Sequence, residues 1–155
     1  MFHATVSKIR RKKTKHSHLK TLDYRACYQA LAAALKKNLD EAILLNARKE
    51  LVECSRSNIF LVKDKRIFTP PISSGCLEGT TRANVLALAR KNKISCRESA
   101  LNLKDLRRAD EVFVTNAVIG VVPLTKVDGR AIASGKAGPL TKKIQTAYRR
   151  SISER

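Results

Sequence analysis

The chain has 155 residues, of which 43% are hydrophobic, and this combination excludes wholesale disorder and predicts one domain with its own core. Its 32 Lys and Arg residues outnumber its 13 Asp and Glu residues and give a net charge of +19, which favours nucleic acid, an anionic membrane or a small anion as partner. The sequence has no apolar run of about 18 residues and begins without the apolar stretch of a secretory signal, so we expect no membrane span and a cytoplasmic location.

The first segment is strongly basic, and the first predicted helix follows it. Six of the eight residues 8–15 are basic and show no apolar periodicity, which predicts a solvated loop or a ragged strand extension over residues 7–18. Small and apolar residues then recur at steps of three and four over residues 22–37. This spacing predicts an amphipathic helix that ends near Asn38.

Short strands dominate the next part of the chain. Apolar runs separated by polar turns predict a meander whose strands cover residues 42–45, 51–53, 59–62 and 66–69. Pro70 and Pro71 end this region, and a second helix is predicted to begin near Thr80 and to stop at the basic residues 90–93. A strand over residues 94–97 follows.

The last part of the chain alternates between helices and strands. Nearly continuous apolar runs predict interior strands over residues 111–115 and 119–123, and amphipathic spacing predicts helices over residues 103–108 and 140–150. Interspersed strands and helices predict a mixed α/β fold.

We expect residues 1–155 to form a single domain. Within it, a basic strand or loop over residues 1–19 leads into a core over residues 20–150, and a tail over residues 151–155 follows.

Three short features could carry chemistry. Gly79, Thr80 and Thr81 stand at the predicted start of a helix, where free N–H groups, the helix dipole and hydroxyls make an anion cup, although Thr is more often a plain cap there. Lys20 precedes the first helix and is otherwise one of many solvated lysines. Glu53 ends an apolar run, where it could equally be a surface salt-bridge partner.

Other kinds of site are not predicted. The four cysteines form no CxxC pair and have no histidine nearby, so we expect buried thiols and no metal; they are Cys27, Cys54, Cys76 and Cys96. No Ser/His/Asp arrangement, nucleophile elbow, phosphate-binding P-loop or dinucleotide fingerprint is present.

Five blocks in order resemble the C-terminal, cofactor-binding domain of class IV aminotransferases, the fold type IV enzymes that use pyridoxal 5′-phosphate. The blocks are KTLDY (20–24), VECSRSNIF (52–60), TPP (69–71), GCLEGTTR (75–82) and ADEVFVTN (109–116). The resemblance implies the pseudo-barrel domain of the D-amino-acid and branched-chain aminotransferase fold, with pyridoxal 5′-phosphate as cofactor.

The resemblance also implies a role for individual residues. Lys20 is similar to the lysine that forms the internal aldimine and then moves the proton between substrate and cofactor. Glu53 is similar to the glutamate that holds the proton of the pyridine nitrogen, and Tyr24 to the tyrosine that hydrogen-bonds the phenolic oxygen of the cofactor.

Four further residues are implied to bind the cofactor. Thr80 and Thr81 become the phosphate cup, Leu77 packs on a face of the ring, and Asn116 belongs to the same site. The resemblance treats Arg82, Asn58 and Phe60 as scaffold, and Arg56 stands where relatives often have a small residue.

The reaction type stays open between two alternatives. Residues 115–118 (TNAV) are closer to 4-amino-4-deoxychorismate lyases, which release pyruvate and leave 4-aminobenzoate for folate synthesis, than to branched-chain aminotransferases. We therefore lean to a lyase acting on aminodeoxychorismate, with a branched-chain or D-amino-acid transaminase as the alternative.

The resemblance covers only the cofactor domain. In the family a smaller N-terminal domain precedes it and supplies a phosphate-binding arginine and much of the substrate pocket, so whether this chain is an enzyme by itself stays open. We expect a homodimer or pairing with an N-terminal half. The alternatives are an inactive or truncated cofactor domain and, from another class, a basic nucleic-acid-binding protein.

Overall fold

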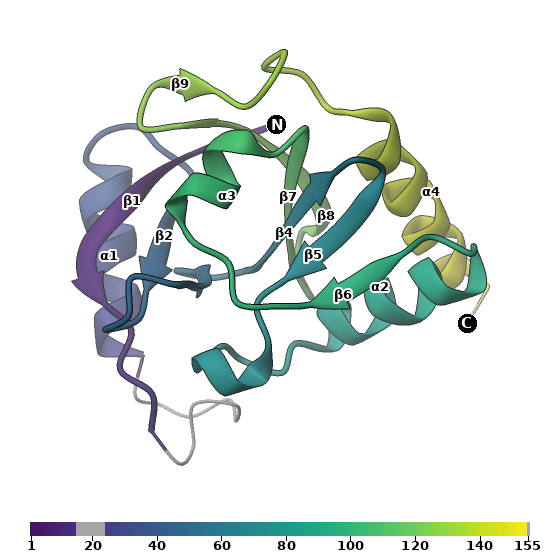
Figure 1. The fold of residues 1–155 in the computed structure, drawn as a ribbon. Helices are drawn as coiled ribbons and strands as arrows, with labels where there is room; N and C mark the ends of the chain where they lie inside the picture. Colours follow the sequence, from purple (N-terminus) through teal and green to yellow (C-terminus); the bar gives the residue numbers. More distant parts are fainter. Residues whose placement is uncertain (15–23, 155) are drawn as a thin grey trace.

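A curled mixed sheet with helices packed on both of its faces forms the framework of the protein (Figure 1). The computed structural model describes residues 1–14 and 24–154. The strands are β1 (Phe2–Arg10), β2 (Glu41–Leu45), β3 (Leu51–Cys54), β4 (Asn58–Lys63), β5 (Arg66–Thr69), β6 (Cys96–Glu98), β7 (Glu111–Asn116), β8 (Gly120–Val127) and β9 (Arg130–Ala131). The helices are α1 (Arg25–Leu35), α2 (Thr80–Lys91), α3 (Leu103–Arg108) and α4 (Pro139–Ser153), with a 3-10 turn over Ile72–Ser74.

The strand order explains why several strands are apolar on both faces. Neighbouring strands run β3-β2-β1-β8-β7-β4-β5-β6, and β9 pairs with β8. β7 and β8 therefore lie inside the sheet, which confirms the interior strands expected from their apolar runs. The mixed α/β class is confirmed as well.

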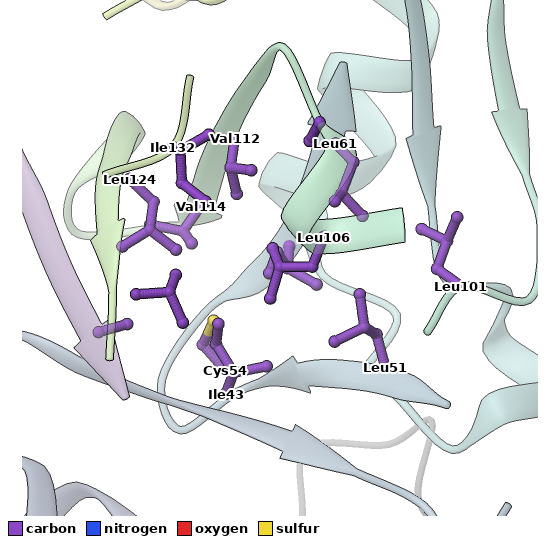
Figure 2. Packing of buried hydrophobic residues seen from close by; sticks show 14 of the residues in the cluster. Ile43, Leu51, Cys54, Leu61, Leu101, Leu106, Val112, Val114, Leu124 and Ile132 are labelled. Atoms are coloured by element: carbon purple, nitrogen blue, oxygen red, sulfur yellow. The ribbon is translucent and has the colours of Figure 1, made fainter. Parts of the chain in front are cut away.

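Alternate residues of the strands face different cores. Ile43 faces the inside of the curled sheet, where a cluster also contains Leu61 and Val114 (Figure 2). Leu44, the next residue of β2, packs instead with α1. Phe60 and the other outward residues of β4 and β7 pack with α2 and α4. Both faces of the sheet are thus covered, as the two-residue period of a strand allows.

The basic first segment begins as part of a strand, so of the two alternatives predicted for residues 7–18 the strand extension is confirmed for residues 7–10. β1 runs to Arg10 and pairs in parallel with both β2 and β8. Lys8 and Arg10 are exposed, whereas Ile9 between them packs on the α1 side. The exposed basic side chains on either side of Ile9 hide the apolar alternation of the strand in the sequence.

The predicted meander is also wrong. β2 pairs with β3 and β4 with β5 as two antiparallel hairpins, but β4 pairs with β7 and not with β3. The two hairpins consequently lie on opposite sides of the β1–β8–β7 centre. The connection from β3 to β4, residues 55–57, therefore joins the edge strand β3 to a strand beyond that centre.

The other elements follow the expected order with shifted ends. α1 lies within the predicted range, and α4 extends to Ser153, into the expected tail. Three cysteines are buried and Cys96 is partly buried. In residues 1–14 and 24–154 no helix is long and apolar enough to cross a membrane.

A buried glutamate fixes the start of α4. The Glu111 carboxylate accepts hydrogen bonds from the backbone N–H groups of Leu140 at 3.0 Å and Thr141 at 2.7 Å. An acceptor at this position satisfies N–H groups that have no partner within the helix and complements the helix dipole. A Cβ atom on Gly138 would lie 2.0 Å from Cδ of Glu111, so the close approach requires glycine.

Candidate active site

Glu53 of β3, which pairs with Leu44 and lies on the same side of the sheet as α1, is the buried carboxylate of the site. It is 4% exposed; Oε1 accepts from Nε of Arg11 at 3.0 Å and Oε2 accepts from the backbone N–H of Leu77 at 2.9 Å. Burial raises the pKa of Glu53, while the Leu77 N–H and the Arg11 charge act in the opposite direction. Each carboxylate oxygen has a second lone pair, so Glu53 retains capacity to accept a further N–H.

Arg11 joins Glu53 to Tyr24. Its guanidinium carbon lies 5.8 Å from the centroid of the Tyr24 ring, within the range of a cation–π contact. Burial raises the pKa of Tyr24, and the negative charge of Glu53 adds to this shift. Sequence reasoning missed Arg11, because it stands in the basic run and looks like its solvated neighbours.

A basic cavity of about 280 Å³ lies beside Arg11. Its lining residues are Arg10, Arg11, Lys12, Thr14, Arg25, Ala26 and Gln29. Neither Glu53 nor Leu77 is among them, so this cavity is separate from the carboxylate end of the candidate site.

Leu77 is held through its backbone. Its N–H donates to Glu53 and its carbonyl oxygen accepts from Nδ2 of Asn58, each at 2.9 Å. Two residues further on, Gly79 caps the N-terminus of α2. The carboxylate of Glu53 and the start of this helix are therefore connected through three residues of backbone.

The two threonines of the predicted cup have different surroundings. Thr80 is exposed at the first position of α2, whereas Thr81 is 2% exposed and its hydroxyl lies 3.4 Å from the hydroxyl of Tyr148. The first turn of α2 contains no acidic residue. An anion at this helix end would thus meet the Thr80 hydroxyl and backbone N–H groups, while the Thr81 hydroxyl points into the core.

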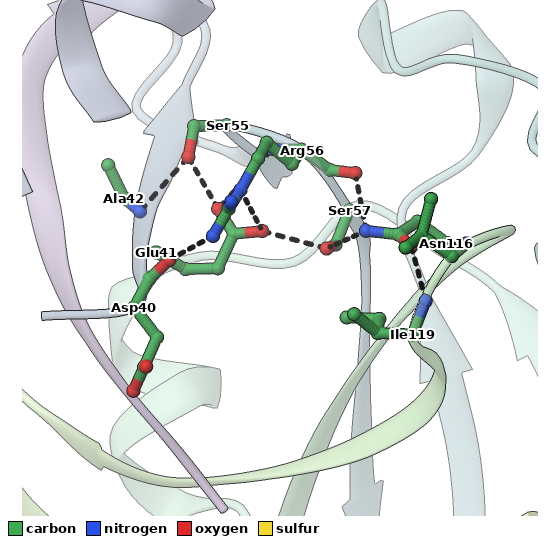
Figure 3. Close-up of polar contacts among 9 residues, drawn as sticks. Asp40, Glu41, Ala42, Ser55, Arg56, Ser57, Asn116 and Ile119 are labelled. Atoms are coloured by element: carbon green, nitrogen blue, oxygen red, sulfur yellow. Dashed lines mark hydrogen bonds and ion pairs between the residues drawn. The ribbon is translucent and has the colours of Figure 1, made fainter. Parts of the chain in front are cut away.

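Asn116 lies at the end of β7 with its amide in use. Nδ2 donates to the carbonyl of Arg56 at 3.1 Å and to Oγ of Ser57 at 3.2 Å, and Oδ1 accepts from the backbone N–H groups of Val118 and Ile119 (Figure 3). Asn116 therefore ties the turn after β7 to the connection after β3.

Glu41 is a second buried carboxylate, which the sequence did not single out. It is fully buried, accepts hydrogen bonds from the hydroxyls of Ser55 and Ser57, and lies 3.9 Å from Nε of Arg56 (Figure 3). Arg56 also donates to the carbonyl of Asp40 at 2.8 Å. The Arg56 guanidinium is thus held at the start of β2, and the loop between β3 and β4 is fixed by Glu41.

The structure brings most of the candidate residues into two connected groups. Tyr24, Glu53 and Leu77 are linked through Arg11 and hydrogen bonds, and Thr80 follows Leu77 closely in the chain. Asn116 belongs to the neighbouring Glu41 group. Lys20 lies outside the described residues, so the structure does not place it relative to these groups.

The family is identified by its sequence. The model of the amino-transferase class IV family matches residues 3–127. A D-alanine aminotransferase of Bacillus licheniformis is 43% identical over 113 residues, which cover 72% of this chain and 39% of that protein. A branched-chain-amino-acid aminotransferase of Pseudomonas aeruginosa is 39% identical over 119 residues, which cover 77% of this chain and 38% of that protein.

Solved structures agree with the sequence matches. The branched-chain amino acid aminotransferase of Escherichia coli superposes with a TM-score of 0.92 at 32% identity, over 96% of this chain and 50% of that chain. A second branched-chain amino acid aminotransferase, solved as a complex with N-(5′-phosphopyridoxyl)-L-glutamate, superposes with a TM-score of 0.94 at 28% identity, over 99% of this chain and 53% of that chain.

The present chain spans about half or less of the length of these relatives. The matched proteins named above are aminotransferases, so they favour the transaminase alternative over the lyase expected from residues 115–118. Class IV aminotransferases depend on pyridoxal 5′-phosphate. From the match over residues 3–127, the chain belongs to the class IV aminotransferase family.

Proposed function

We propose that this chain is the cofactor-binding part of a pyridoxal 5′-phosphate-dependent amino-acid aminotransferase. The observation that carries the proposal is the buried Glu53 carboxylate, which is oriented by Arg11 and the Leu77 N–H and keeps a free lone pair. A protonated pyridine nitrogen is the kind of donor that fits such an acceptor. Bound pyridoxal 5′-phosphate supplies an electron sink for the substrate carbanion, and the protein supplies orientation and charge.

In this proposal Glu53 holds a proton on the ring nitrogen and Tyr24 donates to the phenolic oxygen. The Arg11 cation favours the ionised form of Glu53, which can then keep that proton. Lys20 provides the amine that bonds to the cofactor aldehyde and moves the proton of the substrate. Nearby cations make a lysine lose its proton more readily, and the strongly basic run of residues 8–15 precedes Lys20 in the chain.

The N-terminus of α2 is proposed to bind the cofactor phosphate. Thr80 contributes its exposed hydroxyl, and Thr81 contributes its backbone N–H because its hydroxyl faces Tyr148. The absence of acid from the first turn of α2 favours an anion there. Leu77 is proposed to contact a face of the ring. We assign Asn116 a supporting place beside the site, since its amide already holds the turn after β7.

The proposed substrates are amino acids and 2-oxo acids. The relatives include both D-alanine and branched-chain enzymes, and this supports transamination without choosing the side chain. Residues 115–118 favour the lyase as the second candidate. Because the chain spans about half of its relatives, we propose that catalysis needs the remaining half, in the same polypeptide or as a partner chain, within a homodimer.

Addition of pyridoxal 5′-phosphate to the purified chain tests the proposal. We expect the visible absorption band of lysine-bound cofactor in the wild type, no band in Lys20→Ala, and a normal band in Lys142→Ala, which changes an exposed lysine on α4. Absence of the band from the wild type, or its survival in Lys20→Ala, would contradict the assignment.

The reaction type is tested with the remaining half supplied. Transfer of an amino group from D-alanine or a branched-chain amino acid to 2-oxoglutarate supports the transaminase. Release of pyruvate from aminodeoxychorismate without such transfer would favour the lyase.

A further inference from the structure

The backbone N–H and carbonyl of Leu77 are both held by hydrogen bonds to residues beside the β3–β4 connection. Glu53, one residue before the end of β3, accepts from the Leu77 N–H, and Asn58, the first residue of β4, donates to the Leu77 carbonyl. The connection itself is tight, because the Cys54 N–H donates to the Ser57 carbonyl at 2.7 Å. Leu77 therefore has little freedom to move relative to Glu53.

The same Asn58 side chain also touches the start of α2. A Cβ atom on Gly79 would lie 2.2 Å from Oδ1 of Asn58. The φ angle of Gly79 is −72°, which any residue adopts, so glycine is required here for space and not for backbone conformation. Asn58 is 6% exposed, and its amide fills the gap between Leu77 and the first turn of α2.

We propose that Asn58 is a positioning residue that sets the separation between the Glu53 carboxylate and the N-terminus of α2. This inference rests on the proposed function, in which Glu53 meets the ring nitrogen and α2 meets the phosphate. One rigid cofactor can use both contacts only when their separation matches its own length. Asn58 holds that separation through one hydrogen bond to Leu77 and one close contact with Gly79.

The residue type follows from the two contacts. A donor is needed for the Leu77 carbonyl, which excludes aspartate and leucine, and a small planar group is needed beside Gly79. Loss of the amide lets Leu77 and α2 shift, and it also weakens the Leu77 N–H bond that opposes the rise in the pKa of Glu53. Neither effect requires Asn58 to touch the cofactor.

The test compares two ligands that differ only in the phosphate group. Affinities of the full chain for pyridoxal 5′-phosphate and for pyridoxal are measured from the visible band, and their ratio reports what the phosphate contributes. We expect Asn58→Ala and Gly79→Ala each to lower the ratio of the pyridoxal 5′-phosphate affinity to the pyridoxal affinity by about fivefold to tenfold. A misaligned phosphate that loses about one hydrogen bond gives a change of this size. A general loss of folded protein lowers both affinities equally and leaves the ratio unchanged.

Matched controls separate positioning from stability. Asn92→Ala removes the same kind of bond, from Nδ2 to a leucine carbonyl at 2.9 Å, at the other end of α2. Asn102→Ala removes the cap of α3 and lowers stability away from the site. Both controls are expected to keep the wild-type ratio.

Three outcomes decide the matter. A lowered ratio in both site variants, with unchanged controls, supports the positioning role. A wild-type ratio in Asn58→Ala overturns it and leaves the proposed function intact. A wild-type chain that binds neither ligand overturns the proposed function and the inference together.

Discussion

Nε of Arg11 donates to Oε1 of Glu53 at 3.0 Å, and both residues are buried although they are 42 positions apart in the chain. A buried carboxylate left without its cation is strongly unfavourable, whereas the intact pair can be close to neutral for stability. Arg11 therefore has two consequences, one for the stability of the fold and one for the charge of Glu53.

Arg11→Met is expected to lower the free energy of unfolding by about 3–5 kcal/mol, because it leaves Glu53 buried and unpaired. Urea unfolding followed by circular dichroism measures this change. Arg10→Met, which alters the exposed neighbour, is expected to have a small effect. If the double variant Arg11→Met/Glu53→Leu is no more stable than Arg11→Met, the unpaired charge is not the cause.

Glu53 should make stability depend on pH. Its pKa in the folded chain is raised by burial, so the folded chain binds the proton more tightly than the unfolded chain does. The stabilisation is complete below the ordinary glutamate pKa and is lost as the pH rises through the raised pKa. Urea unfolding across this pH range should show a decrease in the free energy of unfolding of the wild type that is missing in Glu53→Gln. Identical pH profiles in the two proteins would rule out Glu53 as the source of the decrease.

Glu41→Gln tests the second buried carboxylate. The carboxylate accepts from Ser55 and Ser57, and an amide would turn an N–H group toward these donors. We expect a loss of about 1–3 kcal/mol in the free energy of unfolding, typical of a buried polar group left unsatisfied. Glu78→Gln, an exposed change next to Leu77, serves as the control, and an equal effect in both variants would argue against the buried network.

Gly138→Ala is expected to destabilise the protein by about 1–3 kcal/mol, because its methyl group would overlap the Glu111 carboxylate. Removal of that carboxylate should remove most of the penalty. In a double-mutant cycle, Gly138→Ala should therefore cost less in a Glu111→Ala background than in the wild type. If the destabilisation by Gly138→Ala and by Glu111→Ala in thermal unfolding is simply additive, the methyl group does not overlap the Glu111 carboxylate in the variant.

The sequence predicted those parts of the protein whose signals are local. The helix that begins at Thr80 follows from a glycine and two threonines, and the interior strand β7 follows from its continuous apolar run. β1 gave no such signal, because exposed Lys8 and Arg10 interrupt its apolar pattern and its partner strands are distant in the chain. The meander failed for a related reason: hairpin spacing predicts neighbours but not that β4 pairs with β7.

The residues of the candidate site also divide into those that the sequence could indicate and those that it could not. Glu53 and Leu77 could be named from a family resemblance, and the structure places them in contact through one hydrogen bond. Arg11 and Glu41 could not be named, and Asn58 was named only as scaffold, since the contacts of each depend on burial and on partners far away in the sequence. A charged residue inside a basic run looks solvated until its acidic partner is known.

The central place of β1 has a consequence for the time course of folding. β1 lies between β2 and β8, and near its middle the Val6 N–H donates to Asp128 across a separation of 122 residues. Closing so long a loop is entropically costly, and folds dominated by such pairings form slowly. During synthesis β1 can pair with β2 early, but its other edge stays open until β8 has left the ribosome. Until then the growing chain carries an unpaired strand edge, and the charges of Lys8 and Arg10 on this strand discourage association with other chains.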